Sequence, residues 1–119
     1  MAKLQLRPGD RLAILHRPAG LDLGVGTGAA TGDLDPDDAD AVLLFATTSA
    51  DLHGADGSYV VEAARRDDLV WVAYPKGGKL DTDLSRDSLA AALREQGLRP
   101  VRQVSIDEVW SALRFRPQA

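Results

Sequence analysis

The chain has 119 residues, of which 45% are hydrophobic and 27% charged, and this length suits one compact domain spanning residues 1–119. It contains no cysteine, which excludes disulfides, thiolate nucleophiles and cysteine-ligated metal sites. The formal net charge is −4, with acid concentrated at residues 33–40 and arginine at residues 94–116. The basic residues form no continuous stretch, so nucleic acid is not an expected partner.

Three unalternating apolar runs predict buried strands. They cover residues 12–16, 41–46 and 69–75, and each is bounded by turn residues. Runs of this kind are typical of strands that are covered on both faces of a sheet. The longest, Leu69–Pro75, should lie in the centre of the sheet. The glycine-rich residues 17–34 between the first two runs predict a loop.

Two helices and a hairpin follow from the remaining patterns. Residues 58–66 predict a helix capped by Asp56 or Ser58, because Gly54 and Gly57 weaken the stretch before it. Cap residues at 83–87 predict a second helix that ends at Gly97. Period-two alternation in residues 101–106 and 109–115 predicts an antiparallel pair, with Val109, Leu113 and Phe115 on one face.

These elements predict an α/β fold: a Rossmann-like, mostly parallel sheet of about five strands with a C-terminal antiparallel hairpin. The order from Asp40–Phe45 through Leu69–Pro75 to the hairpin resembles the C-terminal half of a class I S-adenosylmethionine-dependent methyltransferase. With Arg7-Pro8-Gly9, Tyr74-Pro75-Lys76 and residues 83–87, the whole chain is similar to small uncharacterised bacterial domains of that truncated fold. The resemblance implies an architecture and assigns no activity.

The string Asp22-Leu23-Gly24-Val25-Gly26-Thr27-Gly28 looks like the methyltransferase cofactor loop. In such a loop, glycines let the backbone approach the ligand closely. However, residues 17–20 cannot continue a buried strand, residues 29–33 make a poor helix, and no acid stands where the cofactor ribose would be held. We therefore expect a glycine-rich connection and assign no cofactor. Cofactor binding is the alternative interpretation, and it would use Asp22, Gly24, Gly26 and Gly28.

The acidic residues 33–40 resemble the start of a calcium loop, but the sixth and twelfth positions are Asp38 and Leu44 where glycine and glutamate are needed. We expect a solvated loop and no metal site. His16 and His53 have no neighbouring ligand pattern.

A candidate ligand site is expected at the carboxyl ends of the parallel strands, where open α/β sheets bind their ligands. Cations, hydroxyl groups and the amides at a helix start should converge there and could hold an anion or a nucleotide. Thr47 and Thr48 end the second strand at the same edge. The expected ligand-binding residues are His16, Arg17, Tyr74, Lys76, Ser85, Arg86 and Asp87.

We expect a non-catalytic binding or protein-interaction module, because no nucleophile and base stand at a recognisable spacing. The alternatives are a small-ligand binding protein and, with less support, a small methyltransferase. Right-handed crossovers should place both helices on one face of the sheet. The second face is also apolar, which predicts a homodimer or an obligate partner that covers it. The chain lacks an apolar run of about 20 residues and a signal-peptide core, so a cytoplasmic location is expected.

Overall fold

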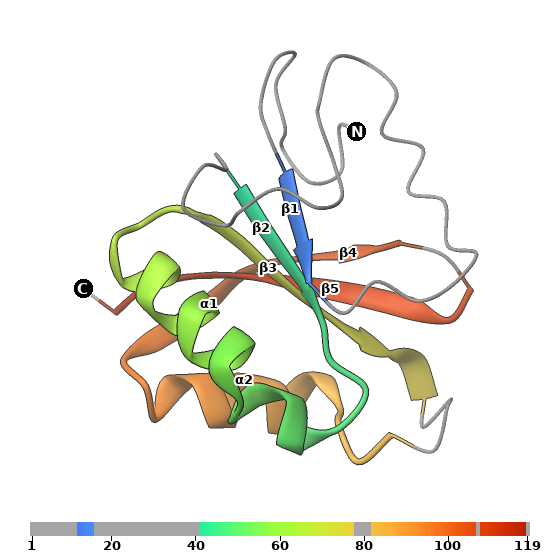
Figure 1. The fold of residues 1–119 in the computed structure, drawn as a ribbon. Helices are drawn as coiled ribbons and strands as arrows, with labels where there is room; N and C mark the ends of the chain where they lie inside the picture. Colours follow the sequence, from blue (N-terminus) through green and yellow to red (C-terminus); the bar gives the residue numbers. More distant parts are fainter. Residues whose placement is uncertain (1–11, 16–40, 78–81, 107, 119) are drawn as a thin grey trace.

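Five strands form a single sheet in a computed structural model of the protein, which describes residues 12–15, 41–77, 82–106 and 108–118 (Figure 1). Two α-helices and one short 3-10 helix connect the strands. In chain order the elements are β1 (Leu12–Leu15), β2 (Ala41–Phe45), η3 (Ser49–Leu52), α1 (Ala55–Arg65), β3 (Leu69–Pro75), α2 (Arg86–Arg94), β4 (Leu98–Ser105) and β5 (Trp110–Pro117).

The strand order across the sheet is β1-β2-β3-β5-β4. β1, β2 and β3 run parallel, whereas β5 is antiparallel to both β3 and β4, and the antiparallel pairings join more residues than the parallel ones. The prediction of a mostly parallel, Rossmann-like sheet is therefore wrong, and the sheet is mixed. The reason lies in the hairpin. Residues 110–113 of β5 are all buried and need a neighbouring strand on each side, whereas most of β4 is exposed and takes the edge.

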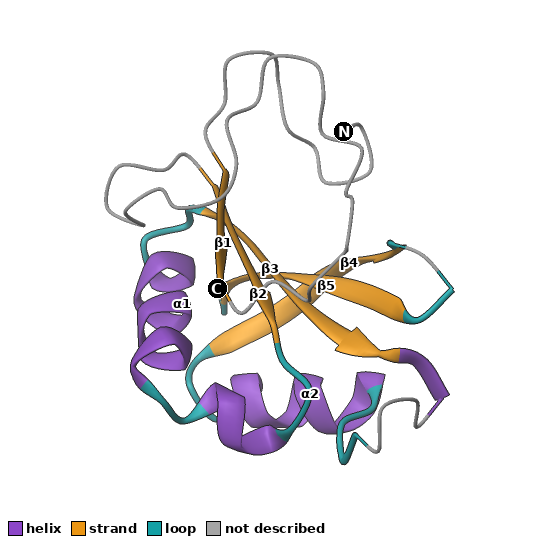
Figure 2. Ribbon diagram, turned by 45° about the vertical axis from the view of Figure 1, so that its right-hand side comes forward, coloured by secondary structure: helices purple, strands orange, loops and turns teal. Residues whose placement is uncertain are grey.

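Both helices pack on the same face of the sheet, as predicted from the crossovers (Figure 2). On this face, Val60 and Ala64 of α1 and Leu89 of α2 join the sheet residues Val72 and Phe115 in one cluster. The side chains are nearly or completely inaccessible to solvent. Burial of this apolar area is the main favourable contribution to folding.

The opposite face of the sheet, called here the helix-free face, carries a second apolar cluster built from strand residues. Phe45 and Trp110 meet edge to face, with ring centroids 5.0 Å apart and planes at 89°. Leu43 and Trp71 are 0% exposed within the single chain. A homodimer was expected because this face was predicted to be apolar and exposed. The described apolar residues of this face are instead buried or partly buried. The homodimer therefore stays a prediction without that support.

Helix α1 begins at Ala55, earlier than the predicted residue 58, and its N-cap is Gly54 rather than Asp56 or Ser58. Gly57 explains the difference. A Cβ atom there would lie 2.2 Å from the backbone oxygen of Leu52, so the helix can pass η3 only because this position is glycine. Gly57, which was expected to weaken the helix, is therefore the residue that allows α1 to pack against η3.

Helix α2 begins as predicted. Ser85 is the N-cap: its Oγ accepts from the Ser88 amide at 3.1 Å, and the Ser85 amide donates to the Ser88 hydroxyl at 2.8 Å. The helix itself ends at Arg94, and Gly97 takes a left-handed φ of +83° just beyond it, as expected of a glycine at a helix end. None of the described helices has the length and apolarity needed to cross a bilayer.

The hairpin prediction was correct for Leu113 and Phe115, which face the helices. It was wrong for Val109, which packs against the helix-free cluster. β5 begins only at Trp110, so Val109 is outside the regular alternation of the strand.

Candidate functional site

A pocket of about 380 Å³ lies on the helix side of the sheet, where β3 ends and α2 begins. Its walls come from four parts of the chain: the end of β3, the start of α2, β4 and β5. Four of the residues expected at the ligand site line it, namely Tyr74, Lys76, Ser85 and Arg86. The remaining lining residues are Gly77, Leu84, Gln103 and Ser111.

We call this cavity the strand-end pocket, and Tyr74 is one of its buried lining residues. Tyr74 is 5% exposed, it lies opposite Ser111 in the sheet register, and its hydroxyl accepts a hydrogen bond from Gln103 Nε2 at 3.3 Å. Burial raises the pKa of Tyr74 above its ordinary value of 10.0, although a hydrogen bond with Ser111 and the positive charge of Arg86 act in the opposite direction. The phenol therefore stays protonated at neutral pH and can donate a hydrogen bond.

Lys76 is held at one side of the pocket by contacts that include two with the hairpin. Its backbone amide donates to the Val109 carbonyl at 2.7 Å, which ties the end of β3 to the hairpin. Its ammonium group donates to the Ser105 hydroxyl at 2.5 Å. The residue is half-buried, and the bond to Ser105 holds its ammonium group beside β4.

Arg86 supplies a second positive charge from the first residue of α2. Its guanidinium lies 3.6 Å from the carboxylate of Asp87, but the two side chains are 59% and 94% exposed, so this pair is weak. Ser85 caps the Ser88 amide, whereas helix geometry leaves the amides of Arg86 and Asp87 without acceptors inside the helix. The helix dipole therefore adds to the positive potential at this end of the pocket.

The loop after β2 braces the start of α2 and does not line the pocket. The amides of Thr47 and Thr48 donate to the Asp51 carboxylate at 2.9 and 3.2 Å. The Ser49 amide and hydroxyl donate to Asp83 at 2.8 and 2.7 Å, and these bonds lower the pKa of the Asp83 carboxyl. These contacts fix the segment before α2 against the end of β2.

Besides the four expected residues that line the strand-end pocket, others lie beside it or outside the described residues. Asp87 lies next to the strand-end pocket but does not line it, and the same holds for Thr47 and Thr48. The remaining expected residues lie outside the part of the chain that the structure describes. They are His16, Arg17, Asp22, Gly24, Gly26 and Gly28.

Sequence reasoning missed Gln103, Ser111 and Leu84. Gln103 and Ser111 enter the pocket because β5 pairs with β3 and brings β4 with it. The signal available in the sequence was the alternation of residues 101–106, which places Gln103 and Ser105 on a common face. This alternation predicts pocket residues only if the hairpin is known to lie beside β3.

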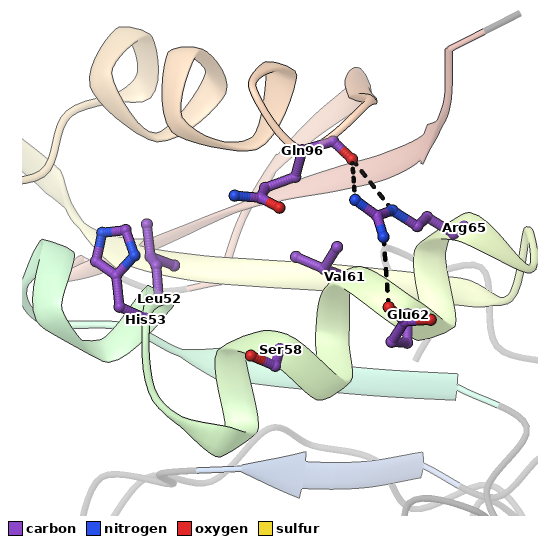
Figure 3. A pocket seen from close by; sticks show the side chains of 7 residues that line it. All are labelled: Leu52, His53, Ser58, Val61, Glu62, Arg65 and Gln96. Carbon is purple, nitrogen blue, oxygen red and sulfur yellow. Dashed lines mark hydrogen bonds and ion pairs between the residues drawn. The ribbon is translucent and has the colours of Figure 1, made fainter.

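A second, smaller pocket of about 170 Å³ lies between α1 and the end of α2 (Figure 3). Arg65 lines this pocket, and its guanidinium donates twice to the Gln96 carbonyl, at 3.2 and 3.0 Å. Arg65 also lies 3.4 Å from Glu62. These bonds connect the end of α1 to the turn after α2, which is a structural role. The full lining is Leu52, His53, Ser58, Val61, Glu62, Arg65 and Gln96.

No known protein family, curated protein or solved structure matches the chain. The resemblance to truncated methyltransferase domains is therefore not tested by these comparisons and stays a prediction. Any functional conclusion must come from the geometry of the pocket itself.

Proposed function

We propose that this protein is a non-catalytic module that binds a small organic anion in the strand-end pocket. The observation that carries the proposal is the convergence of Lys76, Arg86 and the start of α2 on one cavity. The volume of about 380 Å³ falls in the range typical of small-molecule sites, which is about 300 to 1,000 Å³.

The lining suggests a ligand with an anionic head and a short apolar part. Arg86 offers a planar fork that matches a carboxylate or phosphate, and Lys76 offers a compact charge. The neutral Tyr74 hydroxyl can donate to a further oxygen, while Leu84, which is 5% exposed, provides apolar contact. A carboxylate or a phosphate ester fits this arrangement.

A thermal-shift panel of phosphate, phosphate esters, nucleotides and small carboxylates tests the proposal. A ligand present at about 100 times its dissociation constant should stabilise the protein by about 2.7 kcal/mol, and calorimetry then measures the affinity. Arg86→Gln should weaken binding at least about tenfold, because a charged hydrogen bond is lost from a partly enclosed site. The matched control is Arg94→Gln, which removes the same charge at the other end of α2.

Two results would overturn the proposal. One is a panel in which no anion raises the melting temperature. The other is an anion whose affinity is equal in the parent protein and in Arg86→Gln, since such an anion binds elsewhere.

A homodimer and a cytoplasmic location remain parts of this proposal that rest on the sequence alone. Light scattering coupled to size exclusion tests the first. A species of 12.7 kDa that persists at high protein concentration would contradict a dimer. Cell fractionation of the tagged protein tests the second.

A further inference from the structure

Edge strand β4 contacts the strand-end pocket from two strands away. β5 lies between β3 and β4, so the backbones of β3 and β4 are about 10 Å apart. Two side chains at the end of β3 nevertheless reach β4. The Tyr74 hydroxyl accepts a hydrogen bond from Gln103 Nε2 at 3.3 Å. The Lys76 ammonium group donates to the Ser105 hydroxyl at 2.5 Å. Two pocket residues are therefore held by a strand that is not their neighbour.

The two contacts have the same spacing on both segments. Tyr74 and Lys76 are two positions apart, and so are Gln103 and Ser105. Residues two positions apart on a strand project from the same face of the sheet. This face is the helix side, because Tyr74 belongs to the cluster under the helices. The register thus places the two contacts side by side on the side of the sheet where the pocket lies.

Ser111 of β5 leaves room for these contacts. It lies directly opposite Tyr74 in β3 and directly opposite Ser105 in β4. Residues that are directly opposite on neighbouring strands project from the same face. A large side chain at position 111 would therefore stand between β3 and β4, on the path from Tyr74 to Gln103. The small serine lines the pocket and is 5% exposed.

The stability of the sheet edge does not require these contacts. Gln103 and Ser105 are exposed on an edge strand, where water can satisfy a polar side chain without a protein partner. Each of them nevertheless bonds to a residue that lines the pocket. Gln103 also lines the pocket itself, whereas Ser105 contacts it through Lys76. The contacts therefore order the pocket wall.

We propose that Gln103 and Ser105 are positioning residues of the strand-end pocket. This inference rests on the proposed function, in which the pocket binds a small organic anion. Gln103 fixes the phenol of Tyr74, and Ser105 fixes the ammonium group of Lys76. The phenol oxygen is the acceptor in its bond to Gln103, so that bond does not use the phenol proton. Both groups are held in place before a ligand binds, which reduces the side-chain freedom lost on binding.

Calorimetry with phenyl phosphate tests the proposal, because this probe combines an anionic head with an apolar ring. Ser105→Val and Ser105→Thr are nearly isosteric, both residues suit a strand, and only threonine keeps the hydroxyl. Ser105→Val should weaken binding about three- to tenfold, whereas Ser105→Thr should stay within about twofold of the parent protein. Gln103→Met keeps the side-chain length but removes the donor, and it should weaken binding by a similar factor. Melting curves verify that the variants are folded.

A double-mutant cycle shows whether Gln103 acts through the phenol. Gln103→Met should have no further effect on the affinity for phenyl phosphate in a Tyr74→Phe background. Equal losses in both backgrounds would overturn the role of Gln103. Equal affinities of Ser105→Val and Ser105→Thr would overturn the role of Ser105.

The proposed function and this inference have different signs of failure. Binding of phenyl phosphate that is weakened by Arg86→Gln but by none of the β4 variants would overturn this inference alone. Absence of binding to the parent protein, or binding that Arg86→Gln leaves unchanged, would overturn both.

Discussion

Replacing Gly57 with alanine should destabilise the protein, although the same change usually stabilises a helix. In a helix interior, alanine is favoured over glycine by about 1 kcal/mol, and this is the upper bound for Gly57, which lies in the first turn of α1. Here the new Cβ would lie 2.2, 2.4 and 2.9 Å from the O, C and Cα atoms of Leu52, all of them backbone atoms. Relieving this overlap requires α1 and η3 to separate, and overpacking of this kind costs about 3 kcal/mol. The net loss is therefore about 2 kcal/mol.

Urea denaturation followed by tryptophan fluorescence measures this loss, because Trp71 and Trp110 are buried and report on the core. In thermal melts the loss corresponds to about 6 to 12 °C for a domain of this size. Gly54→Ser is the matched control: a Cβ at Gly54 meets nothing within 4 Å, and serine is a better N-cap, so stability should rise by a few tenths of a kcal/mol. A neutral or stabilising Gly57→Ala would refute the close passage of α1 over η3.

Three further predictions concern the C-terminal part of the chain. Gly97→Ala should destabilise by about 1 kcal/mol in denaturant melts, because its φ of +83° strains a side-chain-bearing residue even though there is space for a Cβ; an effect near zero would contradict this. Phe115→Ala should destabilise by about 3 kcal/mol, since the ring is 0% exposed, and a loss below about 1 kcal/mol would mean that β5 is not anchored in the core. Arg116→Ala should have a smaller effect, which depends on pH. The pKa of Asp67 is lowered from 3.8 in the folded state, so the contribution of the pair is complete above that value and disappears as pH falls through the folded pKa. Melts of Arg116→Ala and the parent protein should therefore differ at pH 7 and converge in acid, and a constant difference would exclude the ion pair as the cause.

The positions of the strands could be predicted from the sequence, whereas their order could not. The runs at residues 12–15, 41–45 and 69–75 are apolar at both odd and even positions, and this pattern identifies a buried strand without reference to its neighbours. The hairpin was also visible. The sheet is mixed because β5, and not β4, lies beside β3. Which of these two strands takes that place depends on how deeply each is buried in the folded protein.

The candidate site was predicted where the rule for strand ends applies and missed where the hairpin contributes. Tyr74, Lys76, Ser85 and Arg86 follow from the end of β3 and the start of α2, both of which are local signals. Gln103 and Ser111 depend on pairing between distant segments. The bulge between Pro100 and Arg102 was also missed, although Pro100 is a signal for it, because strands hold proline mainly at edges and bulges.

The position of β5 has a consequence for folding during synthesis. The ribosome makes β3 well before β5, yet β5 is the neighbour that completes one side of β3. At about 5 to 20 residues per second, the interval is about 2 to 7 seconds. Throughout this interval β3, the longest of the three parallel strands, has an unpaired edge that could associate with another nascent chain. A chain stalled between α2 and β5 should therefore aggregate or recruit a chaperone, whereas one released after Pro117 should fold unaided.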